Sequence, residues 1–512
     1  MNETIVKHLN FGEDAKNKIF KGIETLTKAV SSTLGASGKC VIMENQNGDP
    51  QITKDGVTVA NSIILLDPVE NMGAKLIKEA ARKTVKEAGD GTTTATVLAY
   101  AILQEAYRFK ELNPRELKTG INKAVKKVVQ HLEKNSSKVK KNNIEQVATI
   151  SANNDKDLGK VIYEAFDSVG KDGLVIMETH DEPNTKVEII KGVQYEQGFS
   201  NPHFVTNKAK NEVELNDCLV LIVDSPIENI RKIQNILEHV IKNQLPLLVI
   251  ADVEPQVSSA LAMNKVKGNI KINIIAAPTY GANRKNTLDD LSLLTGAKVI
   301  SEDLGDDLDL IDIKYLGKCK KVVSNTIETI IQIESKSEEV IKLTKDLEDQ
   351  YNKTTKGFIK DSLEKRVSRL KAKVAVVKVG ANSEIELKEK RDRVEDAICA
   401  TKAALKEGIV SGGGIALLNA SSDIEVDSKS EEVLLRAITY PYKTILSNAG
   451  IENYQTPTVK GTGLNVVTGE TVNMVKSGII DPLLVTKSAL RNAASVATTI
   501  ISTDCVINNL RA

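Results

Sequence analysis

The chain has 512 residues, and its 69 Lys and Arg residues nearly balance its 68 Asp and Glu residues. This balance argues against a strongly charged surface for nucleic acid or anionic lipid, and the length suggests about three domains. Hydrophobic residues make up 41% of the sequence, but aromatic residues make up only 3% and Trp is absent, so we expect aliphatic cores.

The five cysteines and five histidines indicate neither a disulfide framework nor a zinc site, because they show no C-x-x-C pair and no metal-ligand spacing. The N-terminus, Met1 to Phe11, has neither the apolar core of a signal peptide nor an Arg-rich transit pattern. No apolar run reaches the length that spans a bilayer. We therefore expect a soluble cytoplasmic protein.

In chain order, residues 12–135 are predicted to be rich in helix. A hairpin-like piece at Cys40 to Ile64 interrupts them, with one turn signal at Asn47 to Pro50 and another at Asp55-Gly56. A polar stretch rich in Lys and Asn, Lys134 to Asn143, then indicates a boundary.

Two helices of this first region flank an unusual loop. Apolar periodicity predicts one helix at Val69 to Ala88, and a stretch free of Gly and Pro predicts another at Ala95 to Tyr107. Between them, Gly89-Asp90-Gly91-Thr92-Thr93-Thr94 is typical of a helix start that faces an anion. Because Asp90 suits a hard cation that bridges phosphates, we interpret the loop as a site for nucleotide plus Mg²⁺. A tight Asp-Gly turn with Thr92 as N-cap is an equally weighted alternative.

From Gly192 the sequence alternates between buried strands and helices. The strands are expected at Leu219 to Val223, Leu245 to Ile250 and Lys271 to Ala276, and the helices at Asn229 to Lys242 and Gln256 to Val266. This order predicts a parallel sheet covered by helices.

Two long charged helical segments follow, and a short strand at Val374 to Val379 separates them. They are expected at Glu334 to Arg369 and at Glu384 to Leu405. The last hundred residues return to Ala-rich helices punctuated by Gly. The fold class is therefore α/β with several domains.

No Walker A motif and no Rossmann fingerprint in the right context occurs, so a phosphate site would have to be assembled from separate loops. Thr33 to Gly38 is a glycine-bearing helix end, Lys54-Asp55-Gly56 is a hairpin turn, and Gly412 to Gly414 follows a long helix. Taken singly, each is better explained as a helix C-cap or a tight turn. Asp481-Pro482 suits an N-cap followed by proline, and Asp396 alone suits a solvated charge.

Several strings containing these loops stand in one order along the chain. They are Phe11-Gly12-Glu13-Asp14-Ala15, Ile52 to Ala60, Glu70-Asn71-Met72-Gly73-Ala74, Gly89 to Thr96, Thr149 to Asn153, Arg393 to Ala397 and Asp481-Pro482. In these strings the whole chain resembles the group I chaperonins of bacteria and organelles, the Hsp60 class.

The resemblance implies a chaperonin fold with three nested domains. They are an equatorial ATP-binding domain at 1–135 and 407–512, an intermediate domain at 136–191 and 374–406, and an apical client- and lid-binding domain at 192–373. It also implies a homo-oligomeric, seven-membered single or double ring that folds unfolded protein clients under a co-chaperonin lid, driven by ATP and Mg²⁺, with K⁺ as a further candidate ion. The protein would work in a bacterial cytoplasm, or in a host cytoplasm if it is virus-encoded.

The resemblance also carries over site residues. Asp396 and Asp55 match the carboxylates associated with hydrolysis, and Asp90 matches the metal ligand. The nucleotide-contacting positions are Thr33, Leu34, Gly35, Ala36, Lys54, Asp90, Gly91, Thr92, Thr93, Thr94, Gly413, Asn465, Val466, Val467 and Asp481. The client-binding positions are Phe199, His203, Phe204, Leu237, Leu261 and Met263.

The chain departs from the family at several of these places. Ala36-Ser37 and Val466-Val467 replace the usual residues on the base side, and Ala372-Lys373 replaces paired glycines at the apical hinge. The helix at Asn229 to Lys242 has an apolar arc wide enough that we expect part of it to remain exposed for clients. A polar client groove leaves open a ring scaffold or holdase that binds nucleotide without productive encapsulation; a small-molecule kinase is a weaker alternative.

Overall fold

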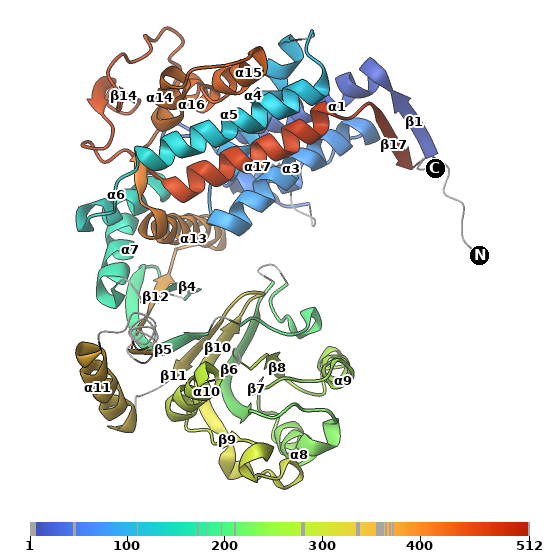
Figure 1. Ribbon diagram of the computed structural model, residues 1–512, viewed down its shortest axis with the longest axis vertical. Helices are drawn as coiled ribbons and strands as arrows, with labels where there is room; N and C mark the ends of the chain where they lie inside the picture. The colour runs from blue at the N-terminus through green and yellow to red at the C-terminus, as the bar shows by residue number, and fades with distance from the viewer. Residues whose placement is uncertain are drawn as a thin grey trace. The chain divides into compact units, whose positions relative to one another are not determined.

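The computed structural model describes residues 7–44, 48–109, 111–170, 174–180, 182–195, 197–208, 211–277, 282–333, 338–354, 363, 366–367, 370 and 373–509. The chain forms two compact units. Unit 1 comprises Met1–Glu164, Met177–Lys186 and Val377–Ala512, and unit 2 comprises Ala165–Ile176 and Val187–Val376. Unit 1 is mainly helical and unit 2 is α/β (Figure 1).

Unit 1 is built around a layer of long helices. They are α1 (Gly12–Ser31), α3 (Pro68–Ala88), α4 (Thr92–Arg108), α5 (Pro114–Lys134) and α17 (Leu483–Ile501). The last of these, α17, packs against α3, α4 and α5 (Figure 1). Their shared core consists of small and aliphatic side chains such as Ile77, Leu98, Ile102 and Ala493, as the low aromatic content predicts.

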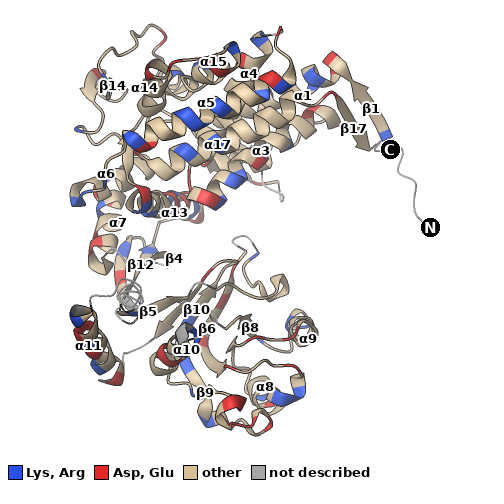
Figure 2. Ribbon diagram, in the orientation of Figure 1, with Lys and Arg blue, Asp and Glu red and all other residues tan. Residues whose placement is uncertain are grey.

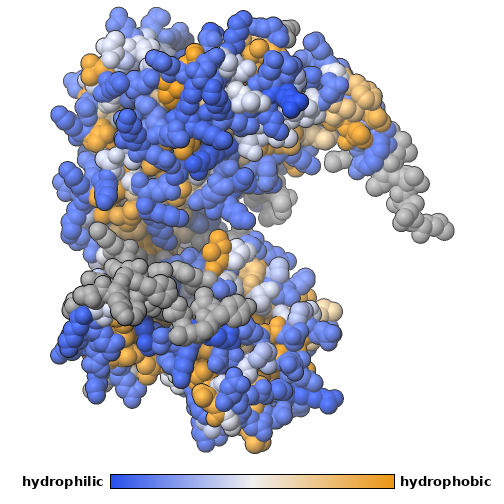
Figure 3. Space-filling view, in the orientation of Figure 1, coloured by the Kyte–Doolittle hydropathy of each residue, from blue (hydrophilic) through white to orange (hydrophobic). Residues whose placement is uncertain are grey.

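The two ends of the described chain meet in unit 1. Strand β1 (Lys7–Phe11) pairs antiparallel with β17 (Cys505–Asn509) in a sheet of two strands. Leu9, Phe11 and Ile507 are exposed on this pair, and apolar orange surface appears at the same place in Figure 3.

The predicted hairpin at Cys40 to Ile64 is correct only in its first half. Strands β2 (Val41–Glu44) and β3 (Pro50–Thr53) pair antiparallel, but Gly56–Ser62 forms helix α2. The second half is helical because Asp55 does not close a hairpin turn. Its carboxylate instead accepts hydrogen bonds from the N–H groups of Val57 and Thr58 and caps the helix.

Further helices and strand pairs complete unit 1. The elements are α6 (Lys141–Ser151), α7 (Lys156–Val169), α13 (Glu384–Glu407), β13 (Ile409–Ser411), α14 (Ile415–Asp423), α15 (Lys429–Ala437), α16 (Tyr440–Asn448), β14 (Thr462–Asn465), β15 (Glu470–Asn473) and β16 (Ile480–Pro482). Gly414 is the N-cap of α14 with φ +76°, so the glycine triplet begins a helix and is not a C-cap. Asp481 lies in strand β16 and Pro482 is the N-cap of α17, so the expected Asp cap is also wrong.

The alternation predicted for unit 2 is confirmed. Strands β6 (Val213–Val223), β7 (Leu247–Ile250) and β8 (Ile272–Ile275) are parallel neighbours in its sheet. The short helix η2 (Ile230–Ile233), α8 (Gln234–Lys242) and α9 (Pro255–Val266) connect these strands. After α10 (Ala282–Thr295), β9 (Val299–Ile300) pairs parallel with β6 on its other side.

Antiparallel strands complete the sheet, in the order β4-β12-β5-β11-β10-β6-β7-β8. The antiparallel strands are β10 (Gly317–Ser324), β11 (Thr329–Ile333) and β5 (Lys186–Tyr195). Beyond β5 in this order lie β12 (Lys373–Val379) and β4 (Leu174–Thr179). Of the predicted charged helix at Glu334 to Arg369, α11 (Glu338–Lys353) is described, and β12 and α13 confirm the strand and helix expected after it. Ala372 lies outside the described residues, and so does the Lys373 side chain.

Charges are spread evenly over the fold, as the near-zero net charge predicts. Figure 2 shows Lys or Arg as well as Asp or Glu on both units. Among the described residues, no helix combines the length and the apolar character that a membrane crossing requires.

The helical unit 1 and the α/β unit 2 confirm the predicted α/β multidomain class. The predicted boundaries that would divide unit 1 into two domains stay predictions.

Candidate nucleotide-binding site

Unit 1 contains a cavity of about 950 Å³ in which loops from both ends of the sequence meet. The end of α1, the α3–α4 loop, the α6–α7 turn, helix α13 and the segment 464–467 all contribute side chains to its wall. All fifteen predicted nucleotide-contacting residues line it, and so do Asp55 and Asp396. The structure therefore brings together residues that the sequence separates by several hundred positions.

The α3–α4 loop presents the start of a helix to this cavity. Gly89 ends α3 with φ +75°, and Gly91 is the N-cap of α4 with φ +92°, both in the left-handed region that favours glycine. The alternative with Thr92 as N-cap is wrong, because Thr92 is the first residue of α4 and no side chain caps the helix. The first N–H groups of α4 are thus left without a side-chain cap at the cavity wall, as an anion site requires.

Four carboxyl groups line the cavity, those of Asp55, Asp90, Asp396 and Asp481, and Asp90 repels each of the other three. Burial raises the pKa of Asp90, and nearby Asp55 adds to this rise, although the N–H of Gly91 opposes it. Burial, Asp90 and Asp55 together raise the pKa of Asp396 well above its usual range. Burial, with a contribution from Asp90, raises the pKa of Asp481 to about 7. Each aspartate keeps a partly exposed surface because it faces the cavity, while protein surrounds its other sides.

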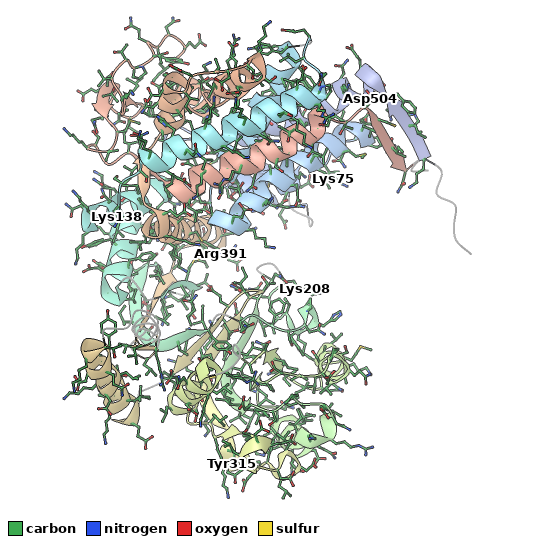
Figure 4. All side chains as sticks on the ribbon, in the orientation of Figure 1. Lys75, Lys138, Lys208, Tyr315, Arg391 and Asp504 are labelled. Atoms are coloured by element: carbon green, nitrogen blue, oxygen red, sulfur yellow. The ribbon has the colours of Figure 1, made fainter. Side chains whose placement is uncertain are left out.

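A fifth carboxyl group extends the cluster along α13. Burial raises the pKa of Asp392, and Arg391, labelled in Figure 4, opposes this rise by donating to its Oδ1 at 3.1 Å. The interpretation of Asp396 as a solvated charge is wrong, because α13 turns its side chain into the cavity, where burial raises its pKa.

A divalent cation fits this concentration of negative charge. Among the described residues, no three His, Cys, Asp or Glu side chains are arranged to hold a metal by themselves. Mg²⁺ commonly takes one or two carboxylates and completes its shell with water and substrate phosphates. Asp90, next to the uncapped start of α4, is the residue placed to supply such a ligand.

Lys54 supplies positive charge from the same wall. Burial lowers the pKa of its ammonium group, and Arg393 lowers it further, whereas Cys40 and Glu389 favour the charged form. Arg393 itself donates to Glu389 at 2.7 Å and to Asp155 at 3.2 Å. The half-buried Lys54 beside Asp55 is thus suited to contact a phosphate.

The wall that the resemblance assigns to the base lies between the end of α1 and the β14–β15 hairpin. Gly35 has φ +84°, and a Cβ there would approach the Ile445 side chain to 3.0 Å. Val466 packs into a small apolar cluster with Tyr442, whereas Val467 is 71% exposed. Of the two valines that replace the usual residues of the family, only Val466 belongs to this packed wall.

Sequence reasoning missed several residues that line the cavity or support its wall. Tyr442 and Asn448 carry no motif, although Tyr442 lines the wall and Asn448 binds the end of α1. Asn153 and Asn154 have φ +59° and +63°, and both line the cavity at the turn after α6. Asn153 closes one of the matching strings, and that string was the signal that could have identified this turn.

The predicted client-binding residues lie in unit 2, and half of them are buried. Phe204, Leu237 and Leu261 are at most 8% exposed, while His203 is exposed and Met263 is 62% exposed. Phe199 is partly buried against the core. On η2 and α8, the expected open apolar edge is reduced to Ile241, because the helix turns its other apolar residues onto the sheet or leaves them only partly exposed. The client-binding role of the six residues stays a prediction.

Comparison with known proteins gives this geometry a context. Residues 26–511 match the model of the TCP-1/cpn60 chaperonin family. Two crystal structures of the chaperonin gp146 from the bacteriophage EL 2 (Pseudomonas aeruginosa), both in the presence of ATP-BeFx, share the fold at 23% sequence identity. Crystal form II aligns over 100% of both chains with a TM-score of 0.74, and form I over 98% of this chain and 99% of that chain with a TM-score of 0.66. The protein is therefore a member of the TCP-1/cpn60 chaperonin family.

Proposed function

We propose that this chain is an ATP-hydrolysing chaperonin subunit that captures unfolded proteins in a ring cavity and promotes their folding. The observation that carries the proposal is the cavity of unit 1, where an uncapped helix start, Lys54 and four aspartates clustered around Asp90 face one space. A polyanion would accept hydrogen bonds from the uncapped helix start, and a hard cation bound with it would offset the negative charge of the aspartates. The gp146 structures, determined with ATP-BeFx, support a nucleotide as that polyanion.

Binding would use the groups that have no competing partner. The N–H groups of the first turn of α4 would donate to phosphate oxygens, and Lys54 would add a positive charge. Thr93 is held beside the end of α1, because its Oγ1 lies 3.4 Å from Oγ1 of Thr33. Mg²⁺ bound by Asp90 would supply neutralisation of the phosphate charge.

Hydrolysis would depend on Asp396. Phosphoryl transfer to water needs an oriented nucleophile and charge stabilisation more than covalent help. The raised pKa of Asp396 makes its carboxylate a better proton acceptor for an attacking water near neutral pH than an ordinary aspartate. Asp55 is already fixed by its two helix-capping hydrogen bonds, so its charge is held in place before any nucleotide arrives.

Ring assembly and client capture rest on two exposed surfaces. The β1–β17 pair has only two strands, and its exposed Leu9, Phe11 and Ile507 would be covered by a second copy of the chain. On α9, Met263 and Val266 are each 62% exposed and offer apolar contact to an unfolded chain. A co-chaperonin lid belongs to the same proposal.

A ring scaffold or holdase is the second candidate. The burial of Phe204, Leu237 and Leu261 favours it, because these side chains offer little surface to a client. Both candidates bind nucleotide, so binding alone does not distinguish them.

The test uses the purified full-length chain. We expect Mg²⁺-dependent ATP turnover, a ring in electron micrographs, and recovery of a denatured test protein that requires ATP and a lid protein. Absence of both Mg-ATP binding and turnover would refute the proposal. Binding and capture without recovery, with any lid tried, would support the scaffold or holdase instead.

A further inference from the structure

Two cysteines face each other across neighbouring strands in the core of unit 2. Cys218 lies on β6 and Cys319 on β10, and they are direct partners in the antiparallel register. Their Sγ atoms lie 3.0 Å apart. Both residues are buried, with exposed fractions of 1% and 5%. The nucleotide site makes no use of them.

The backbone geometry of this pair suits a disulfide. Directly opposed residues of antiparallel strands have Cα atoms about 4.5 to 5.5 Å apart, which lies within the roughly 4.4 to 6.8 Å that disulfides span. Because a disulfide needs an S–S distance of about 2.05 Å, the sulfur atoms have to approach by only about 1 Å. Small side-chain rotations supply this movement without a change of strand register.

The two thiols differ in how readily they would react. The Cys319 thiol and burial raise the pKa of the Cys218 thiol far above its ordinary value. Cys319 is the more exposed of the two, and its Sγ also lies 3.6 Å from the carbonyl oxygen of Cys218. Because Cys319 is the more exposed sulfur, it is the one that meets an oxidant first. Because both thiols are buried, a water-sized oxidant can reach them more readily than a bulky disulfide reagent.

We propose that Cys218 and Cys319 form a redox site, which a small hydroperoxide such as hydrogen peroxide converts to a cross-strand disulfide. The Cys319 thiolate attacks one peroxide oxygen, the O–O bond breaks, and Cys319 becomes a sulfenic acid while hydroxide leaves and takes up the proton that the thiol released. The Cys218 sulfur then attacks the Cys319 sulfur, so that the S–S bond forms and the S–O bond breaks. The departing hydroxide takes the Cys218 proton, and two thiols plus one hydrogen peroxide give one disulfide and two waters.

The bond would tie together two halves of the sheet. Strand β6 pairs with the parallel strands β7 and β9, whereas β10 pairs with the antiparallel strand β11. The cross-link joins residues 101 positions apart and therefore restricts the unfolded chain. Oxidised unit 2 should consequently unfold at a higher denaturant concentration than reduced unit 2.

The chemical test treats the native full-length protein with hydrogen peroxide, alkylates the remaining thiols in denaturant, and identifies peptides by mass. We expect a linked Cys218–Cys319 peptide, lighter than its two reduced parts by two hydrogens and released by dithiothreitol. Cys40 is exposed and serves as the internal measure that the oxidant has acted. Complete oxidation of Cys40 with Cys218 and Cys319 both still alkylated would overturn the proposal.

A second measurement uses Cys319→Ala as the matched control. Peroxide should raise the urea midpoint of unit 2 in the parent protein and leave the midpoint of Cys319→Ala unchanged, and dithiothreitol should reverse the rise. Equal shifts in parent and variant would contradict the assigned bond. Both readouts are independent of ATP turnover, so they remain decisive whether or not the proposed ATPase activity is found.

Discussion

The Nδ2 atom of Asn448 donates to the carbonyl oxygen of Leu34 at 2.9 Å, although 414 residues separate the two in sequence. The same amide group donates to the carbonyl oxygen of Ser31 at 2.8 Å. Asn448 therefore ties α16 to the end of α1, where Thr33, Leu34 and Gly35 line the cavity. A side chain outside the cavity lining thus helps to position the loop that forms one of its walls.

Asn448→Ala should weaken nucleotide binding more than it slows hydrolysis. Removal of the amide takes the Asn448 donor from the carbonyl oxygen of Leu34 and leaves that of Ser31 only its backbone donor. The loop should loosen, which corresponds to about 1 kcal/mol and a five- to tenfold loss of affinity. The residues proposed for chemistry lie elsewhere in the cavity, so turnover at saturating ATP should change less than twofold. Steady-state kinetics separate the two, and an unchanged KM with a large fall in kcat would contradict a positioning role.

The sequence predicted most elements of the fold because their patterns are local. The helix at Val69 to Ala88 agrees with α3 to within one residue, since Asp67 caps it, Pro68 begins it and Gly89 ends it. Errors arose where one residue type serves two purposes. Asp55-Gly56 has the composition of a hairpin turn, but the same Asp also caps a helix, and the long-range packing of α2 against α1 and α3 decides between them.

Much of the candidate site was also identified from sequence, but its electrostatics were not. The resemblance to the family supplied the lining residues, whereas the mutual influence of Asp90, Asp396 and Asp481 depends on three-dimensional proximity. The burial of Leu237 could not be predicted either, because it depends on how α8 packs against the sheet. A helix with a broad apolar arc does not reveal how much of that arc the sheet covers.

Asp396→Asn should keep nucleotide binding and lose most hydrolysis. The amide preserves the shape of the side chain but cannot accept a proton from water, and general base catalysis commonly contributes about 100-fold or more. Removing one of the repelling carboxylates should leave Mg-ATP affinity equal or higher. Single-turnover assays and calorimetry measure the two effects, and parent-like turnover would remove Asp396 from the catalytic list.

Substitutions of Asp55 should separate its structural role from its charge. Asn caps helices about as well as Asp, so Asp55→Asn should retain stability, whereas Asp55→Ala should lower it by about 1 kcal/mol. Both variants lack the carboxylate and should hydrolyse ATP at least tenfold more slowly. Urea unfolding beside turnover assays makes the comparison, and an Asn variant with full activity would leave Asp55 only its capping role.

Without nucleotide, stability should fall as the pH rises through the range in which Asp481 titrates. Its pKa is about 7 in the folded protein against an ordinary 3.8, so the unfolded chain releases the proton first. Between these values the unfolded state holds fewer protons and stability declines, and above about pH 7 the contribution is constant. Asp481→Asn should therefore be more stable than the parent near pH 8 and similar near pH 4. An identical pH dependence of the two urea midpoints would show that Asp481 does not carry this charge penalty.

Client capture is best tested on the exposed face of α9. Leu237→Glu, the obvious choice from sequence, would place a charge at a residue that is 8% exposed and would destabilise unit 2 whatever its role. Met263 is 62% exposed, so Met263→Glu should preserve folding, ring assembly and ATP turnover. It should still reduce capture of a denatured test protein severalfold, because each ring would lose the same apolar contact in every subunit.

Ser259→Glu provides the matched control for this variant. Ser259 lies on α9 and is exposed like Met263, so the control adds the same charge to the same helix without removing apolar surface. Co-sedimentation of the denatured protein with each ring measures capture. Loss with Met263→Glu alone would assign capture to apolar contact at Met263. Equal loss with both variants would point to general repulsion by the added charge, and full capture by both would place the client surface on another part of unit 2.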